Sequence, residues 1–489
     1  MSTGAGDIDA RTSATMRSFL DLEDQAPDVM FDVLPGMTVP FWARVRMQMF
    51  WAMSAQLTGS VEVSSMSEWT RAKELERVAR GFMPSGWDAV RRARRHQVCF
   101  YVAGGTLAAE DGRARNWLVD DFAEAAGDAV VVQTRPLPSA LGLPVFRPTL
   151  SMEPAIARAR WRARGRPLSS RFRVEMNKAF GEFARLLDVP VETFSRIGAG
   201  VIREEQQRPH QHAELKRMLE RMRPRIVFYD NGSYTYHAET VGIFKDAGAY
   251  VVEPQHGWIG PSHAAYNYGR AFDSPALRRT LPDEVLTFGT FWSDSVRHPG
   301  RVTAIGKPHL ERQTARASDT RARRILIVSS RAEPERTDDF VLDLRAELGP
   351  EWSISFRPHP GERAETASRY PRLSAAPGVA IDAAADVYES LKQSSVVIGV
   401  ASTVLFEARA FGCEVIARDS AFAENVIGDA FGERIIDAHG AAERLRALPE
   451  RKALAVEADP DIWAPRSLER FSSWLDERLS GSQKGALGW

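Results

Sequence analysis

The sequence has little cysteine, no long apolar run and no excess of either charge. Only Cys99 and Cys413 occur among its 489 residues, both within apolar segments, so buried reduced thiols are expected rather than a disulfide framework. No run of apolar residues is long enough to span a membrane, and residues 1–30 are polar and acidic, without a signal-peptide core. We therefore expect a cytoplasmic protein, peripheral at most at the inner face of the cell membrane.

The charges and several absent motifs exclude common classes of protein. Basic and acidic side chains number 64 each, which argues against a nucleic-acid partner bound by bulk electrostatics. There is no GxxxxGK[ST] phosphate loop, no GxGxxG fingerprint after the first apolar strand and no GxSxG elbow. P-loop hydrolases, nicotinamide dehydrogenases and common esterases are thus disfavoured. No metal-ligand spacing occurs, so we expect neither a metal nor another cofactor.

What the chain does contain is two sets of apolar strands separated by helical segments, which is typical of parallel sheets. Its length also favours two domains. The expected fold class is α/β, with two Rossmann-like domains facing across a cleft and a helical N-terminal elaboration. The predicted strands lie at Gln97–Gly105, Ala129–Pro136, Arg225–Asn231 and Tyr250–Gly257 in the first set, and at Arg324–Ser330, Trp352–Pro360, Ser395–Val400 and Glu414–Asp419 in the second.

Composition suggests the domain boundaries. Residues 1–25 are rich in Ser, Thr, Gly, Ala and Asp and are predicted to form a disordered tail. Residues 26–310 form the N-terminal domain, with a charged helical insertion over residues 152–222. Residues 311–475, which begin in a polar segment, form the C-terminal domain, and residues 476–489 are predicted to be a loose tail.

Two segments of the N-terminal domain each allow two interpretations. A helix over Pro40–Leu57 places Phe41, Val45, Met49 and Met53 on one stripe, which favours a core helix; an interfacial helix touching a membrane or a lipid-linked substrate is the alternative. The basic run over residues 90–97 is either a solvated helix end or a phosphate contact.

The strongest chemical pattern is Gly399–Gly412, where a buried strand passes through Ser402 and Thr403 into a helix. Both residues are good helix caps, which is the purely structural explanation. A helix N-terminus at the carboxyl edge of a parallel sheet also suits a diphosphate. Glu407 lies one turn further on and is placed to accept hydrogen bonds from ribose hydroxyls. We predict a donor site here.

A second cationic edge lies in the same domain, at Phe356–Glu362. Arg357 can grip a phosphate with two hydrogen bonds and His359 can add a donor, while the flanking prolines stiffen the loop. Lys307, just before the second domain, is either a solvated lysine or a group that reaches a phosphate across the cleft.

The third pattern is the segment from Glu253 to Gly269, which follows a predicted strand of the first domain. It contains His256 and His263, either of which can serve as a general base near neutral pH or remain a hydrogen-bonded loop histidine. Asp230, at the end of the preceding strand, is a further candidate base, although an Asp in a DNGS turn is commonly structural.

The run from Phe356 to Ile416 resembles the donor domain of GT-B fold glycosyltransferases, and is most similar to bacterial capsule and surface-polysaccharide transferases of the CDP-glycerol glycerophosphotransferase and polysialyltransferase-like group. Those families share a strand that ends in His-Pro and a later strand followed by a Ser/Thr pair. The segment from Glu253 to Gly269 looks like the QHG segment of other surface-polysaccharide proteins. The teichoic-acid enzymes carry Asp-Tyr-Ser-Ser where this chain has Val400–Thr403, which favours a nucleotide sugar over a CDP-polyol.

The resemblance implies a metal-independent glycosyltransferase that moves a sugar from a nucleotide-sugar donor to a saccharide or lipid-linked saccharide of the cell surface. Arg357, His359, Ser402 and Thr403 would hold the donor phosphates, and Glu407 the ribose. His256 or His263 would then lie at the reacting centre. Two alternatives stay open: a nucleotide-sugar 2-epimerase of the same fold, and an inactive protein that serves in binding or assembly.

Overall fold

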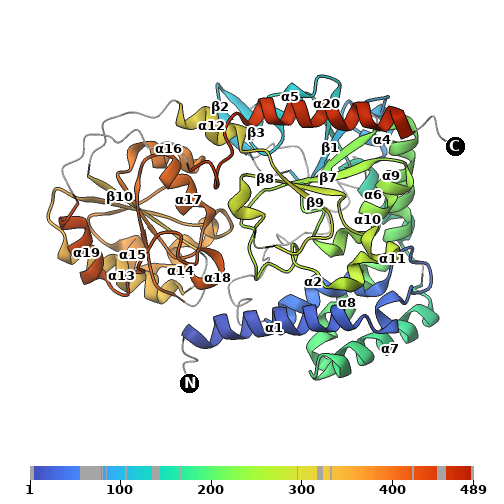
Figure 1. Ribbon diagram of the computed structural model, residues 1–489, viewed down its shortest axis with the longest axis horizontal. Helices are drawn as coiled ribbons and strands as arrows, with labels where there is room; N and C mark the ends of the chain where they lie inside the picture. Colours follow the sequence, from blue (N-terminus) through green and yellow to red (C-terminus); the bar gives the residue numbers. More distant parts are fainter. Residues whose placement is uncertain are drawn as a thin grey trace.

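The computed structural model of the chain describes residues 5–54, 79, 81–83, 85–104, 107–134, 144–165, 167–294, 296–315, 323–330, 333–420, 423–448 and 459–485. Two parallel sheets dominate it (Figure 1). Most of their strands are continuous apolar runs because both faces are covered by helices. In β1 (Val98–Val102), for example, all five side chains are buried.

The first sheet has seven strands in the order β5-β4-β1-β6-β7-β8-β9, all parallel. The chain starts in the middle with β1, adds β4 and β5 on one side, and then crosses to the other side with β6. The switch point of the sheet therefore lies between β1 and β6, where α/β folds commonly bind ligands. The bounds are β4 (Ala129–Gln133), β5 (Thr149–Ser151), β6 (Ile226–Tyr229), β7 (Tyr250–Pro254), β8 (Glu284–Thr287) and β9 (Arg301–Ala304). A separate antiparallel hairpin is formed by β2 (Leu107–Glu110) and β3 (Arg113–Asn116).

The second sheet has five parallel strands in the order β12-β11-β10-β13-β14. Its switch point lies between β10 and β13 for the same reason. The bounds are β10 (Arg324–Val328), β11 (Ser353–Arg357), β12 (Val379–Ile381), β13 (Val396–Gly399) and β14 (Glu414–Ala417). The chain is thus an α/β protein of two Rossmann-like domains, which confirms the predicted fold class.

The helices cover the sheets and fill the space beneath the first domain. Those of the N-terminal part are α1 (Ala5–Gln25), α2 (Phe41–Met53), α4 (Ala89–Arg92), α5 (Asp120–Ala125), α6 (Glu153–Ala163), α7 (Ser170–Leu186), α8 (Ser195–Glu205), α9 (Arg208–Met222), α10 (Ala238–Asp246), α11 (Pro275–Arg278) and α12 (Pro308–Thr314). Those of the C-terminal part are α13 (Pro334–Glu347), α14 (Thr366–Arg369), α15 (Pro371–Ala375), α16 (Val387–Gln393), α17 (Thr403–Ala410), α18 (Ala423–Val426), α19 (Ala438–Arg446) and α20 (Ser467–Gly485).

The two predicted tails differ from the structure. Residues Ala5–Gln25 form helix α1 rather than a disordered tail, because Met16, Phe19 and Leu22 line one face and are buried. At the other end, helix α20 continues to Gly485 instead of giving way to a loose tail. It also returns to the first domain and lies beside α5 (Figure 1). There Phe471 packs against Phe122 of α5 with ring centroids 4.6 Å apart.

Helix α2 decides between the two interpretations of the aromatic segment Pro40–Leu57. The structure describes this segment up to Ser54, and residues 55–57 lie outside the described part. Phe41, Trp42, Val45 and Met49 are each 0% exposed, so the core interpretation is confirmed. Its aromatic face packs on α7, and Phe41 meets Phe180 edge to face at 5.3 Å. This stripe is therefore not available to a membrane surface. Cys99 and Cys413 are buried and free, as expected. No helix in the described ranges is both long and apolar enough to cross a membrane.

The two domains meet through aromatic side chains. Trp292 of the first domain packs on Phe406 of α17 with centroids 4.8 Å apart, and Trp463 lies 5.2 Å from Phe288. The Trp463 indole donates a hydrogen bond to the Phe406 carbonyl at 3.3 Å. The segment that carries Trp463 therefore joins the domains just before α20 begins.

Candidate functional site

The segment after β7 carries the most unusual polar groups of the first domain. Glu253, in β7, is 0% exposed, and its carboxylate accepts from the Ser233 backbone N–H at 2.6 Å and from the Tyr266 hydroxyl at 2.9 Å. Burial raises the pKa of Glu253 to about 7, and the charge of Asp230 acts in the same direction. A carboxyl that titrates near neutrality is suited to proton transfer.

His256 lies close to this carboxyl group. Its Nδ1 atom is 3.8 Å from Glu253 Oε1, is buried and has no hydrogen-bond partner. Burial lowers the pKa of His256 to about 4, so the imidazole is neutral and able to accept a proton at physiological pH. A small contraction of the 3.8 Å gap would let Glu253 bond the imidazole and stabilise its charged form.

His263 is differently placed, and the structure separates the two histidines. Its Nδ1 accepts from the Ala265 backbone N–H at 3.2 Å, and its Nε2 lies 3.1 Å from the Tyr234 hydroxyl. Burial lowers the pKa of His263 to about 3. With both ring nitrogens engaged, His263 fixes the loop, while His256 is the better candidate base.

Asp230 spans the switch point of the first sheet. Its two carboxylate oxygens accept from the backbone N–H of Ala103, which follows β1, at 2.8 and 3.0 Å. Asn231 follows in the left-handed conformation, with φ of 60°. These contacts favour the structural interpretation of Asp230: the residue ties the ends of β1 and β6 together.

Helices α1 and α2 contact the loop that follows β7. Arg46 of α2 and Glu23 of α1 form an ion pair in which both side chains are 0% exposed. Arg46 also donates to the carbonyl oxygens of Ala264 and Asn267, and its guanidinium lies 4.3 Å from the Tyr268 ring centre. Helix α1, which was predicted to be part of a disordered tail, thus supplies the carboxylate of Glu23 that pairs with Arg46.

In the second domain, the predicted phosphate ligands lie along one sheet edge. Arg357 ends β11, and Ser402 follows β13, with β10 between them. Ser402 caps α17, its hydroxyl accepting from the Val404 N–H at 3.2 Å, and Thr403 is the first helical residue. His359 is exposed and its Nδ1 caps the following turn by accepting from the Gly361 N–H at 3.1 Å.

Arg357, however, already has an anionic partner. Its guanidinium donates to Asp382 at 2.8 Å and is 7% exposed. Burial acts to raise the pKa of Asp382, but hydrogen bonds from Ser390 and Arg357 outweigh it and lower that pKa. A phosphate would have to share this guanidinium with a charged carboxylate.

Arg418 is the basic group that sequence analysis missed. It follows β14 on the same edge, is 5% exposed, and its Nε has no hydrogen-bond partner. No described carboxylate pairs with it, and burial, aided by the charge of Arg336, lowers its pKa to about 10. The signal was present in the sequence, because the predicted strand Glu414–Asp419 contains this arginine where the strand ends.

Lys307 and Glu407 come together across the domain boundary. They form an ion pair in which each side chain is 7% exposed. The Lys307 ammonium lies over the rings of Trp117 and Phe288, at 4.3 and 5.1 Å, and the Tyr388 hydroxyl donates to Glu407 at 3.1 Å. The two residues were predicted to contact phosphate and ribose separately; in this structure they hold each other and join the domains.

A chain of contacts links this pair to the His256 loop. Gln255 accepts from the Phe288 backbone N–H at 2.6 Å, and Phe288 contacts Lys307. A cavity of about 10 Å³, with room for a single water, lies between these residues and is lined by Trp117, Pro254 and Gly306 among others. Among the described residues, no group of three His, Cys, Asp or Glu side chains could hold a metal ion.

Acid is expected to unfold the protein readily. Burial lowers the pKa of five histidines from 6.5 to about 3 or 4: His212, His237, His256, His263 and His298. The unfolded chain binds these protons first, so each histidine lowers the unfolding free energy by about 1.4 kcal/mol per pH unit below 6.5. Glu253 and Asp120, whose pKa values burial raises to about 7 and 6, oppose this and offset about two of the five.

Urea unfolding between about pH 7 and pH 5 checks this expectation. The His298→Asn variant is a matched control, because its amide oxygen can still accept from the Gly300 N–H, as His298 Nδ1 does at 3.0 Å. It should flatten the pH dependence by about one proton. A free energy of unfolding that stays level as the pH falls from 6.5 to about 5 would contradict the buried neutral histidines.

Comparison with known proteins gives the following. No protein-family model matches the chain, and the search of curated proteins found no match. Among solved structures, UDP-GlcNAc 2-epimerase from Methanocaldococcus jannaschii is similar with a TM-score of 0.47 at 9% identity, covering 78% of this chain and 99% of the other. A putative UDP-N-acetylglucosamine 2-epimerase from Listeria monocytogenes gives 0.46 at 12% identity over 79% and 97%. The glycotransferase of kitacinnamycin gives 0.37 at 16% identity over 79% and 96%.

Proposed function

We propose that the protein is a glycosyltransferase that takes a sugar from a nucleotide-sugar donor and transfers it to a saccharide or lipid-linked saccharide acceptor of the cell surface. The observation that carries the proposal is the unpartnered Nδ1 of His256, which lies 3.8 Å from the carboxylate of the buried Glu253. Such a pair can remove the proton of an acceptor hydroxyl, because the carboxylate stabilises the imidazolium that forms.

The donor would bind at the switch point of the second sheet. The N-terminus of α17, where Ser402 caps the Val404 N–H, would turn the positive end of the helix dipole toward a diphosphate. Arg418 would add a positive charge from β14, whose backbone lies beside β13: the Arg418 N–H donates to the Gly399 carbonyl at 2.8 Å. We assign the departing phosphate to these groups, with His359 at the rim, and regard Arg357 as a support because Asp382 neutralises it.

Ribose would reach Glu407 only after Lys307 releases it. The Lys307–Glu407 pair would then open as the donor enters, freeing a carboxylate for the ribose and an ammonium for the phosphate. Neither role needs a metal ion, since the charge of the leaving group is met by cations of the chain.

A thermal-shift screen with UDP-, GDP-, CDP- and CMP-linked sugars tests donor binding, because a ligand of the folded state raises the melting temperature. Arg418→Gln should weaken the affinity for the preferred donor roughly tenfold or more, the worth of a charge-assisted hydrogen bond. Arg409→Gln on the exposed side of α17 is the matched control and should change nothing. Equal affinities for the wild type and Arg418→Gln would refute the assigned phosphate site.

The 2-epimerase alternative is favoured by one observation, the pKa of Glu253 near 7, since epimerisation also needs a carboxyl that can take and return a proton. Incubation with the donor alone separates the two activities. An epimerase converts the sugar without an acceptor, whereas a transferase needs one. Binding without turnover over a panel of donors and acceptors would instead indicate a binding or assembly protein.

A further inference from the structure

An exposed group of aromatic and basic side chains lies at the outer edge of the first sheet, away from the proposed site. We define the aromatic–arginine ridge as Phe82, Met83, Trp87, Trp161, Arg91, Arg92, Arg162 and Arg164. Asp88 forms an isolated parallel bridge with Ser151 of β5, which places the ridge just beyond the edge strand. Neither His256 nor α17 takes part in it.

The apolar members are unusually exposed. Phe82, Met83, Trp87 and Trp161 expose 45%, 54%, 53% and 48% of their surface, and they make up four of the eleven large hydrophobic side chains that the described residues expose. Phe82 meets Trp161 edge to face at 6.4 Å, so two segments far apart in the sequence form one surface. Contiguous exposed apolar surface of this kind commonly marks an interaction site.

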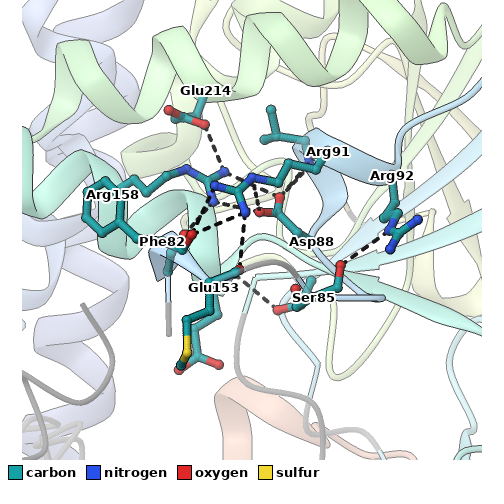
Figure 2. A network of polar contacts seen from close by, with 12 residues as sticks. Phe82, Ser85, Asp88, Arg91, Arg92, Glu153, Arg158 and Glu214 are labelled. Atoms are coloured by element: carbon teal, nitrogen blue, oxygen red, sulfur yellow. Dashed lines mark hydrogen bonds and ion pairs between the residues drawn. The ribbon is translucent and has the colours of Figure 1, made fainter. Parts of the chain in front are cut away.

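A network of hydrogen bonds and ion pairs joins Arg91 and Arg92 of the ridge to the residues around them, as Figure 2 shows. Arg158 of α6 is buried between two carboxylates, at 2.6 Å from Asp88 and 3.1 Å from Glu214 of α9. Arg91 and Arg92 are held over this network by hydrogen bonds to the carbonyl oxygens of Met83, at 3.2 Å, and Ser85, at 3.3 Å. The guanidinium groups of Arg91 and Arg92 are therefore held by the backbone at residues 83 and 85.

The charge of the ridge is positive. Asp88 and Glu214 are 0% and 3% exposed in their side chains and share Arg158 between them. Arg91 also pairs with Asp88, and Arg162 with Glu214, so arginines outnumber carboxylates in this group. Arg91, Arg92, Arg162 and Arg164 are all exposed. Arg164 lies over the Trp161 ring at 4.9 Å, a cation–aromatic pair that presents both an apolar and a charged group to the outside.

We propose that the aromatic–arginine ridge docks the protein on the surface of an anionic lipid bilayer. Tryptophan and phenylalanine at this exposure suit the boundary between headgroups and acyl chains, and arginines meet the negative surface charge. The combination favours a bilayer over a soluble polyanion, which would attract the arginines without needing four exposed apolar side chains. A membrane contact was only the alternative interpretation of Pro40–Leu57, where Phe41, Val45 and Met49 are buried.

Co-sedimentation with vesicles of phosphatidylcholine, with and without phosphatidylglycerol, tests this proposal. The full-length protein should bind the mixed vesicles and not the neutral ones. Arg92→Gln/Arg164→Gln should weaken binding roughly 30-fold, the combined effect of two basic side chains near an anionic surface. Trp87→Ser/Trp161→Ser should weaken it as well, by removing the inserted groups. Arg173→Gln/Val174→Ser is the matched control, since both residues are exposed on α7, and should bind like the wild type.

Three results would overturn the proposal. One is no binding of the wild type to mixed vesicles, and another is unchanged binding in both ridge variants. The third is a different partner in place of vesicles. Retention on heparin or an oligonucleotide without vesicle binding would assign the ridge to a soluble polyanion, and loss of a dimer on ridge substitution without vesicle binding would assign it to a second copy of the chain. Melting temperatures of all variants, measured alongside, show that each is folded.

Discussion

His256→Ala is expected to lower the transfer rate by about 10² to 10⁴, the usual contribution of a positioned general base. The loss should fall on kcat, because His256 belongs to the first domain and the donor would bind the second. Donor affinity, measured by thermal shift, should therefore stay close to that of the wild type. The same assay with His256→Ala and the donor alone reports any residual hydrolysis.

Glu253 is expected to act through His256 as a positioning residue. The dependence of kcat/KM on pH distinguishes this role from a purely structural one. Ionised Glu253 stabilises the imidazolium of His256, so kcat/KM should rise as the pH increases through about 7, the pKa to which burial raises Glu253. In Glu253→Gln the amide oxygen can still accept from the Ser233 N–H, and the amide NH2 can donate to the Tyr266 hydroxyl oxygen, but this rising limb should disappear.

His263→Gln is the matched control for both variants. His263 is half-buried like His256 and lies in the same loop, but its ring nitrogens are occupied by Ala265 and Tyr234. The His263→Gln variant should be less stable than the wild type, and its kcat/KM should still rise as the pH increases through about 7. If His263→Gln abolished transfer while His256→Ala retained it, the assignment of the base would be reversed.

Much of the fold could be predicted because buried parallel strands leave a direct mark on the sequence. The runs at β1, β6, β10 and β13 are almost wholly apolar, β7, β11 and β14 also contain polar residues, and each of the seven was expected. The short strand Thr149–Ser151 was missed because three residues with two hydroxyl side chains carry no such pattern. Helix α1 was hidden by its Ser, Thr and Asp content, which lowers helix propensity, although its buried face makes it a helix.

The sequence predicted where the candidate site residues lie along the strands, but not which side chains pair with them. Arg357, Ser402 and His256 lie at strand ends, as the alternation of strands and helices implies. Asp382, which neutralises Arg357, is 25 residues away, and Lys307 is 100 residues from Glu407. Spacing along the chain says nothing about such contacts, because only the packing of domains brings them together. Glu253 lies within the predicted segment, yet its burial, which raises its pKa to about 7, is a property of the folded protein.

Arg46→Met is expected to cost about 3 to 5 kcal/mol of unfolding free energy, because it leaves the carboxylate of Glu23 buried without its cation. Glu23 would keep the hydrogen bonds from the Trp42 indole and the Gly269 N–H, both at 2.9 Å, and these do not supply a positive charge. For a domain with a typical stability of about 5–15 kcal/mol the loss is large. Urea unfolding of the wild type and the variant measures it.

The double variant Glu23→Gln/Arg46→Met separates charge from packing. The single amide oxygen of glutamine keeps one of the two acceptor contacts and needs no counter-ion, so the double variant should recover part of the loss. Arg372→Met is the control, because its partner Asp339 and the arginine itself are exposed, at 57% and 62%, and exposed pairs contribute little. A loss in Arg46→Met no larger than in Arg372→Met would show that the buried pair is not needed for stability.

The same substitution also bears on the site. Arg46 donates to the carbonyl oxygens of Ala264 and Asn267, so without it the segment that follows His256 loses two anchors. Transfer should then fall at temperatures where the variant is still folded, and backbone amides of this segment should exchange with solvent faster than those of β7. Normal activity together with a large stability loss would place the role of helices α1 and α2 in the fold alone, whereas the joint loss ties the N-terminal helices to the position of the candidate base.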